Sequence, residues 1–195
     1  MRIKKLLITA IIFAFAGSTA FAQDWQMDKD HTEIRFEIKH ILTTVSGYFK
    51  DYKATVSFDP EQVENAAFNF TVQVKSVDTN NEKRDAHLNS PDFFNSEKYP
   101  EMTFVSKRIS KLPNGHYALE GVLTIKDVSK TIKTEFEYFP PKPHPLLEGK
   151  EVSGYATQFT LNRLDYNVGD GKFLKMGVVG QDVTVTITME ALKDK

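Results

Sequence analysis

Apolar and polar residues alternate along most of the chain from residue 33 onward, with the period of two that is typical of a β-strand with one dry face. In the first such segment Ile34, Phe36 and Ile38 are apolar, and the residues between them are charged. Similar segments follow at 53–58, 68–75, 102–109, 117–125, 132–138, 155–161 and 183–189. The pattern therefore predicts an all-β protein of about eight strands.

One segment interrupts the strands. Residues 84–95 are compatible with one or two short helices, and Ser90 followed by Pro91 matches an N-cap with proline at the first helical position. Phe93 and Phe94 would be the buried contacts of this segment. We see no internal repeat and no linker long enough to separate domains, so a single domain is expected.

Eight strands with one dry face can cover that face in two ways, as a sandwich of two sheets or as one sheet closed into a barrel. An eight-stranded barrel is just wide enough to be filled by its own side chains or to hold one slender ligand. The alternation by itself does not choose between these arrangements.

The N-terminus has the three parts of a secretory signal peptide. Arg2, Lys4 and Lys5 precede the uncharged apolar stretch 6–16, and Ala20-Phe21-Ala22 fits the small-x-small cleavage rule. The apolar stretch is shorter than the roughly 20 residues that a membrane anchor requires. We expect cleavage after Ala22, a periplasmic location, and a mature domain of residues 23–195 without permanent membrane insertion.

Composition removes several classes of function. Lys+Arg 25 against Asp+Glu 26 supplies no basic surface for nucleic acid. Removal of residues 1–22 takes away three basic residues and no acidic one, so the net charge of −1 becomes −4, which argues against docking on anionic membrane. The absence of cysteine excludes disulfides, thiolate metal sites and thiol nucleophiles. The histidines have no zinc-binding spacing, and no catalytic, metal or cofactor motif is found.

Three stretches of the chain resemble one known family. They are the opening, Asp30-His31-Thr32-Glu33-Ile34-Arg35-Phe36 with His40 and Gly47-Tyr48-Phe49; the middle, Thr79 to Phe94 followed by Tyr99 to Ser106; and the later strand and turn, Gly121 to Lys130. These resemble the YceI-like family of secreted lipid-binding proteins, over about Trp25 to Ala191. Asp127 stands where that family usually has glycine, and Ser129 where it has threonine.

This resemblance implies an extended antiparallel eight-stranded barrel, lipocalin-like in shape, whose apolar lumen holds a long isoprenoid or similar amphiphile. Combined with the alternation, it predicts that the lumen is lined by Phe36, Ile38, Phe49, Phe58, Phe70, Val72, Phe104, Leu123, Phe136 and Phe159. Head-group contacts are expected from His40, Arg84, Asp85, His87 and Arg163. Each of these has a structural alternative, because Arg84 and Asp85 could cap the helix and the histidines could be hydrogen-bonded structural residues. The aromatic set could equally fill a core.

The sequence thus predicts a periplasmic protein that carries or sequesters a long apolar lipid, such as a polyisoprenoid, a quinone-like lipid, or a fatty acid or amide. It would act without a cofactor, as a monomer or homodimer. Two other functions stay open: a lipid-modifying enzyme that uses His40 or His87 with Asp85, and a filled barrel that acts only in stress or interaction.

Overall fold

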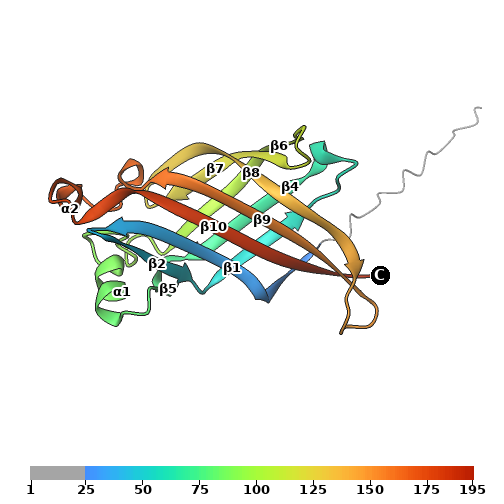
Figure 1. The fold of residues 1–195 in the computed structure, drawn as a ribbon, viewed down its shortest axis with the longest axis horizontal. Helices are drawn as coiled ribbons and strands as arrows, with labels where there is room; N and C mark the ends of the chain where they lie inside the picture. The colour runs from blue at the N-terminus through green and yellow to red at the C-terminus, as the bar shows by residue number, and fades with distance from the viewer. Residues whose placement is uncertain (1–24) are drawn as a thin grey trace, which may run out of the picture.

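A computed structural model describes residues 25–195, so the expected signal segment 1–22 lies outside the described residues. Its main element is one antiparallel sheet, whose strand order is β3-β4-β6-β7-β8-β9-β10-β1-β2-β5 (Figure 1). The strands are β1 Gln26–His40, β2 Thr43–Phe49, β3 Tyr52–Ser57, β4 Ala67–Gln73, β5 Val77–Asp78, β6 Glu101–Lys111, β7 Tyr117–Ile125, β8 Val128–Pro143, β9 Lys150–Asn162 and β10 Val179–Asp194. The all-β prediction is confirmed.

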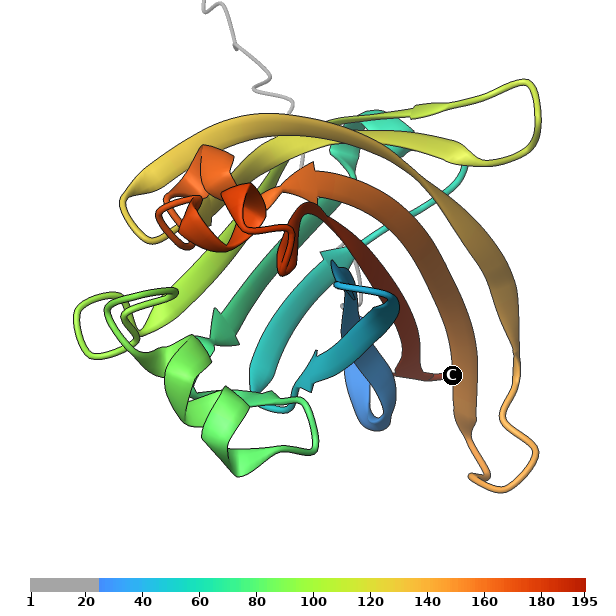
Figure 2. The same ribbon diagram turned by 60° about the vertical axis from the view of Figure 1, so that its left-hand side comes forward.

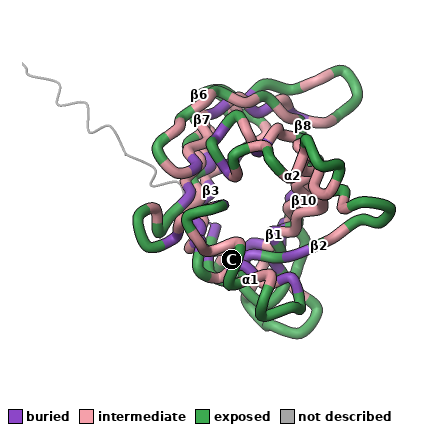
Figure 3. Tube along the Cα trace, turned by 90° about the vertical axis from the view of Figure 1, so that its left-hand side faces the viewer, coloured by how far each residue is buried: buried purple, intermediate pink, exposed green. Residues whose placement is uncertain are grey.

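The sheet curls until β3, the strand at one end of it, meets the start of β1. Trp25, just before β1, forms an isolated antiparallel bridge with Val56 of β3, and the Tyr52 hydroxyl donates a hydrogen bond to the Thr32 carbonyl. The second half of β1 pairs with β2 instead, after a register shift between Asp28 and Glu33. The start of β1 therefore meets β3 while its second half pairs with β2, which closes the sheet into a barrel; the tube in Figure 3 is seen along the axis of this barrel.

Residues 25–195 contain ten strands rather than eight. Residues 77–78 form only a two-residue strand, whereas β2 is a full strand that the alternation missed. Its inward positions are Val45, Gly47 and Phe49, and the glycine hides the apolar period. A Cβ at Gly47 would lie 2.5 Å from Cζ of Phe36, so the aromatic ring of the neighbouring strand occupies the space that a side chain would need.

Helix α1 spans Glu82–Asn89, earlier than expected. Its N-cap is Asn81, whose side chain accepts a hydrogen bond from the Arg84 backbone N–H. The N-cap prediction for Ser90 is wrong, since Ser90 is the C-cap of this helix. Pro91 follows it, as a residue that cannot continue a helix often does.

The other helical segments are short. They are the 3-10 turns η1 Val63–Asn65, η2 Val74–Ser76 and η3 Arg163–Tyr166, and the single turn α2 Lys172–Lys175. Within residues 25–195 no helix is both long and apolar enough to cross a membrane. Helices α1 and α2 lie at the same end of the barrel, which comes forward in Figure 2.

An aromatic cluster closes the opposite end of the barrel. The Phe58 ring lies in edge-to-face contact with Tyr117, Phe136 and Tyr138, at centroid distances of 5.0, 5.5 and 4.8 Å. Trp25 and Ala191 belong to the same buried cluster. Each edge-to-face pair contributes about 0.5–1.5 kcal/mol beyond its buried area, so this end of the barrel is a packed core.

Gly121 is required where β6 and β7 approach. A Cβ there would lie 2.3 Å from Cζ of Phe104 and 2.7 Å from the carbonyl oxygen of Val105. We expect Gly121→Ala to lower the free energy of unfolding by about 1–3 kcal/mol, because backbone must move to admit the methyl group. Urea unfolding measures this effect; Gly115→Ala, at a turn with no atom within 4 Å, reports the cost of a positive φ alone. Equal stability of Gly121→Ala and the wild type would contradict the packing described here.

Candidate functional site: an apolar lumen with a basic mouth

A cavity of about 630 Å³ lies inside the barrel. Its inner end is formed by residues at the edge of the aromatic cluster, among them Phe68, Phe136 and Met189. Its other end reaches α1 and α2 through His87 and Phe173. The volume is in the range of about 300–1,000 Å³ that is usual for small-molecule sites. The cavity, called the lumen below, thus has one end blocked by packed rings and one end at the helices.

Most of the residues predicted to line the lumen do face it. These are Phe36, Ile38, Phe49, Phe70, Val72, Phe104, Leu123, Phe136 and Phe159. The placement of Phe58 in the lumen is wrong, because its ring is 6% exposed and is held inside the aromatic cluster beyond the inner end. Alternation assigned the correct face of the sheet to Phe58, but it carries no information on position along the barrel axis.

Three rings pack at the helical end of the lumen. Phe93 and Phe173 are stacked with centroids 5.9 Å apart, and the His87 ring meets Phe93 edge-on at 5.0 Å. The sequence offered Phe93 only as a helix contact and gave no signal for Phe173, because α2 is too short to have a period. These residues come from two distant segments, and only the fold brings them together.

The charged residues that line the lumen are all basic. They are Arg35, Lys83, Arg84 and Arg163, together with the histidines His40 and His87. No aspartate or glutamate belongs to the lining. Four of the five predicted head-group residues are therefore at the lumen, and Lys83 is an addition that the sequence did not indicate. Arg35 borders the lumen but alternates with the inward-facing Ile34 and Phe36, so its side chain points to the outer face of the sheet, where it pairs with Glu37 at 3.6 Å.

Arg163 is the most unusual of these residues. It is only 4% exposed, and its Nε and Nη1 donate hydrogen bonds to the Gly180 and Val168 carbonyls at 2.8 and 2.6 Å. Its buried Nη2 has no hydrogen-bond partner, and no carboxylate among the described residues forms an ion pair with it. Burial lowers the pKa of the guanidinium, but arginine stays charged in proteins. A positive group with a spare donor therefore borders an apolar space.

Asp85 is not among the residues that line the lumen, so the structure gives no support to its prediction as a head-group contact. Its carboxylate accepts hydrogen bonds from the backbone N–H and the hydroxyl of Thr79. Arg84 donates to the hydroxyl and the carbonyl of the same residue, both at 2.7 Å. These bonds fix α1 to the end of β5. Arg84 and Asp85 thus both have a structural role at the helix, which was the alternative to head-group contact. His87 pairs with Asp92 at 3.2 Å, not with Asp85 as the enzyme alternative requires.

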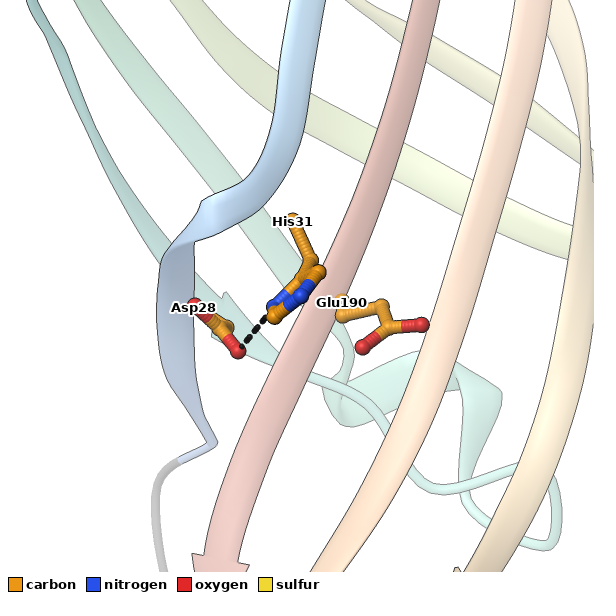
Figure 4. Close-up of side chains that lie close together, drawn as sticks. All are labelled: Asp28, His31 and Glu190. Atoms are coloured by element: carbon orange, nitrogen blue, oxygen red, sulfur yellow. Dashed lines mark hydrogen bonds and ion pairs between the residues drawn. The ribbon is translucent and has the colours of Figure 1, made fainter.

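A separate titratable cluster lies on the outer surface of the barrel (Figure 4). Nδ1 of His31 is 2.8 Å from Oδ2 of Asp28, and ligand atoms of these residues and Glu190 lie within 4.8 Å of one another. This hydrogen bond lowers the pKa of Asp28 and raises the pKa of His31. The pair sits at the bulge of β1, where Thr32 also donates to the Asp28 carbonyl at 2.6 Å. The hydrogen bond between Asp28 and His31 therefore helps to fix the shape of β1 at this bulge.

The pair makes stability depend on pH. The lowered pKa of Asp28 stabilises the fold above the unfolded carboxyl pKa, and this contribution is lost as pH falls through the folded value. The raised pKa of His31 stabilises the fold below the unfolded imidazole pKa, and this contribution is lost as pH rises through the folded value. We expect His31→Asn to destabilise the protein most between about pH 4 and 6.5, and much less at alkaline pH. Urea midpoints across pH test this, and a deficit that is constant with pH would contradict it.

Fold and cavity together define a class: a single β-barrel with a blind apolar lumen and a basic mouth. The YceI-like domain matches residues 25–191, and Protein YceI of Escherichia coli O157:H7 is 31% identical over 196 residues, covering 98% of this chain and 99% of the relative. The chain belongs to the YceI-like family.

Solved structures confirm the barrel. BcnA of Burkholderia cenocepacia superposes with a TM-score of 0.78 at 23% identity, over 85% of this chain and 99% of that one. A polyisoprenoid binding domain from Saccharophagus degradans superposes with a TM-score of 0.63 at 12% identity, over 88% of this chain and 98% of that one. At these identities the likeness concerns the fold.

Proposed function

We propose that this protein binds a long-chain apolar lipid in the lumen and carries or sequesters it. The observation that carries the proposal is the lumen itself, an apolar cavity of about 630 Å³ inside a barrel that is closed at one end. Each CH₂ group removed from water contributes about 0.8 kcal/mol, so a chain in this space is bound firmly without any catalytic group or cofactor. Family membership and the fold shared with a polyisoprenoid-binding domain support the proposal.

The length of the lumen favours an extended chain. On β10, lining residues run from Val179 to Met189. At about 3.3 Å per residue and a tilt of about 40°, these ten steps cover roughly 25 Å along the barrel axis. A prenyl chain, as in a polyisoprenoid or quinone-like lipid, suits this shape, and a fatty acid or amide is the shorter candidate.

The proposed orientation places the head group near Arg163 and the tail against the aromatic cluster. The spare Nη2 donor of Arg163 and the absence of acidic lining residues suit a head group that accepts hydrogen bonds. They disfavour a cationic head group, because like charges would meet in a space of low dielectric constant. The rings of Phe93 and Phe173 would pack where the head group joins the chain.

We also propose that the protein works in the periplasm. Residues 1–22 have the charge pattern and the cleavage sequence of a signal peptide, and the mature chain would begin at Gln23. An aqueous compartment between two membranes is where a long apolar chain needs a carrier, because it does not cross water unaided.

Native mass spectrometry of protein purified from the periplasm without detergent tests this function. We expect a stoichiometric long-chain lipid, released by organic solvent, and a mature N-terminus at Gln23. Protein that is empty and that also fails to take up added prenyl lipids would contradict the proposal.

A further inference from the structure

Three exposed apolar side chains gather at the helical end of the barrel. Ile41, Leu42 and Met176, the mouth patch, are 55%, 86% and 68% exposed. Ile41 and Leu42 form the tip of the β1–β2 hairpin, and Met176 is the C-cap of α2. The Ile41 N–H donates to the Val178 carbonyl at 3.0 Å and ties the hairpin to the segment after α2. Both segments lie at the left-hand end in Figure 1.

The backbone at this tip is strained. Ile41 has a φ of +47°, in the left-handed region that β-branched residues rarely adopt and that glycine or asparagine would enter at little cost. The turn thus combines an unfavourable conformation with a bulky apolar side chain in solvent. Neither feature stabilises the isolated domain, and strained positions of this kind cluster at functional surfaces.

The mouth patch adjoins the lumen directly. His40, which precedes Ile41, lines the lumen, and so do Val178 and Val179 on the other segment. Each exposed tip therefore lies within two residues along the chain of a residue that lines the lumen. Leu146, one of two exposed leucines of the β8–β9 loop, is also 86% exposed, but it lies at the opposite end of the barrel and does not line the lumen.

Lysines flank the mouth patch, although Asp170 precedes and Asp182 follows the second of its two segments. Residues 39–44 and 171–180 contain Lys39, Lys172 and Lys175 and no acidic residue. Lys172 is offset by Asp92 and Asp170 at 3.8 and 3.9 Å. Lys39 and Lys175 are exposed, and no carboxylate in residues 25–195 forms an ion pair with them. Charges more than about 10 Å away are screened at moderate salt, so these lysines count for more locally than the net charge of −4.

We propose that the mouth patch docks on an anionic lipid bilayer, so that a lipid passes between the membrane and the lumen without crossing water. This inference rests on the proposed function and names the partner of the same site. The three apolar tips enter the boundary between head groups and acyl chains, and Lys39 and Lys175 meet the lipid phosphates. The net charge of the chain argued against such docking, but net charge does not show where the charges lie. Lys39 and Lys175 are far apart in the sequence, and the fold brings both beside the mouth patch.

Vesicle sedimentation with the full mature protein tests the proposal. The probes are vesicles of phosphatidylcholine alone and of phosphatidylcholine with phosphatidylglycerol. We expect binding to the anionic vesicles, weakened at least about tenfold in Leu42→Ser/Met176→Ser by the loss of inserted apolar surface. Lys39→Gln/Lys175→Gln should weaken it about 30-fold, from about 1 kcal/mol per lysine. Leu146→Ser, with the same wild-type exposure as Leu42, is the matched control and should bind normally.

A second readout separates this inference from the proposed function. Uptake of a prenyl lipid dispersed from solvent should be equal in all these proteins, whereas uptake from anionic vesicles should slow in the two mouth variants only. If the wild type takes up dispersed lipid but does not bind vesicles, the docking proposal is overturned and the lumen function stands; the patch then faces a protein. Equal losses in Leu146→Ser and the Leu42 variant would also overturn it.

Discussion

Val185→Trp is expected to lower the affinity for a long prenyl lipid by about 50- to 100-fold while the barrel still folds. Val185 lines the lumen on β10, and its cross-strand partners are Phe36 on the adjacent strand β1 and Phe159 on the adjacent strand β9. An indole there displaces about three CH₂ groups of ligand, each contributing about 0.8 kcal/mol. Because the indole enters an existing cavity, overpacking should cost the fold no more than about 1–3 kcal/mol.

Thr184→Trp is the control for this variant. Thr184 is the preceding residue on β10 and points to the other face of the sheet. Competition with a fluorescent lipid measures both affinities, and thermal unfolding checks both folds. Equal binding by the two tryptophan variants would show that the ligand does not occupy the lumen.

Arg163→Met is expected to have two separable effects. The Gly180 and Val168 carbonyls lose their donor, which should lower the free energy of unfolding of the empty protein by about 2–4 kcal/mol. The variant should also lose the preference for a chain with an oxygen-bearing head group over the same chain as a plain hydrocarbon. For a hydrogen bond from a charged donor, that preference should be about 10- to 100-fold in the wild type.

Comparison of the two chains in each protein separates the head-group effect from the stability effect, since both ligands meet the same destabilised barrel. Arg163→Lys keeps the charge but loses the forked donor geometry, so an intermediate preference is expected. A full preference for the oxygen-bearing lipid in Arg163→Met would show that Arg163 has only a structural role.

The alternation of the chain was enough to predict the wall of the barrel. Phe36, Phe70 and Phe159 sit between polar neighbours, and a strand with one dry face leaves them only the inside of the sheet. The alternation did not predict strand β2, because Gly47 occupies one of its inward positions and the Phe36 ring fills the space of a side chain there. The resemblance to the YceI-like family supplied what the alternation left open, namely closure into a barrel rather than a sandwich.

The sequence did not show which residues lie at each end of the barrel. A period of two gives the face of a residue but not its depth, so Phe58 was placed in the lumen instead of the cluster that blocks it. Asp85 and Arg163 are both charged residues within the span of the family resemblance, and only their hydrogen-bond partners distinguish them: Thr79 satisfies the carboxylate of Asp85, while Arg163 keeps an unpaired Nη2. The basic lining likewise depends on which side chains the fold brings to one cavity.

The affinity of the mature protein for prenyl lipids of increasing chain length shows most directly whether the lipid binds inside the barrel. A blind lumen of fixed length predicts that affinity rises steeply with each added isoprene unit, by about 0.8 kcal/mol per buried CH₂, until the tail meets the aromatic cluster. Beyond that length the affinity should level off or fall. An affinity that is independent of chain length, or that rises without limit, would contradict binding inside the barrel.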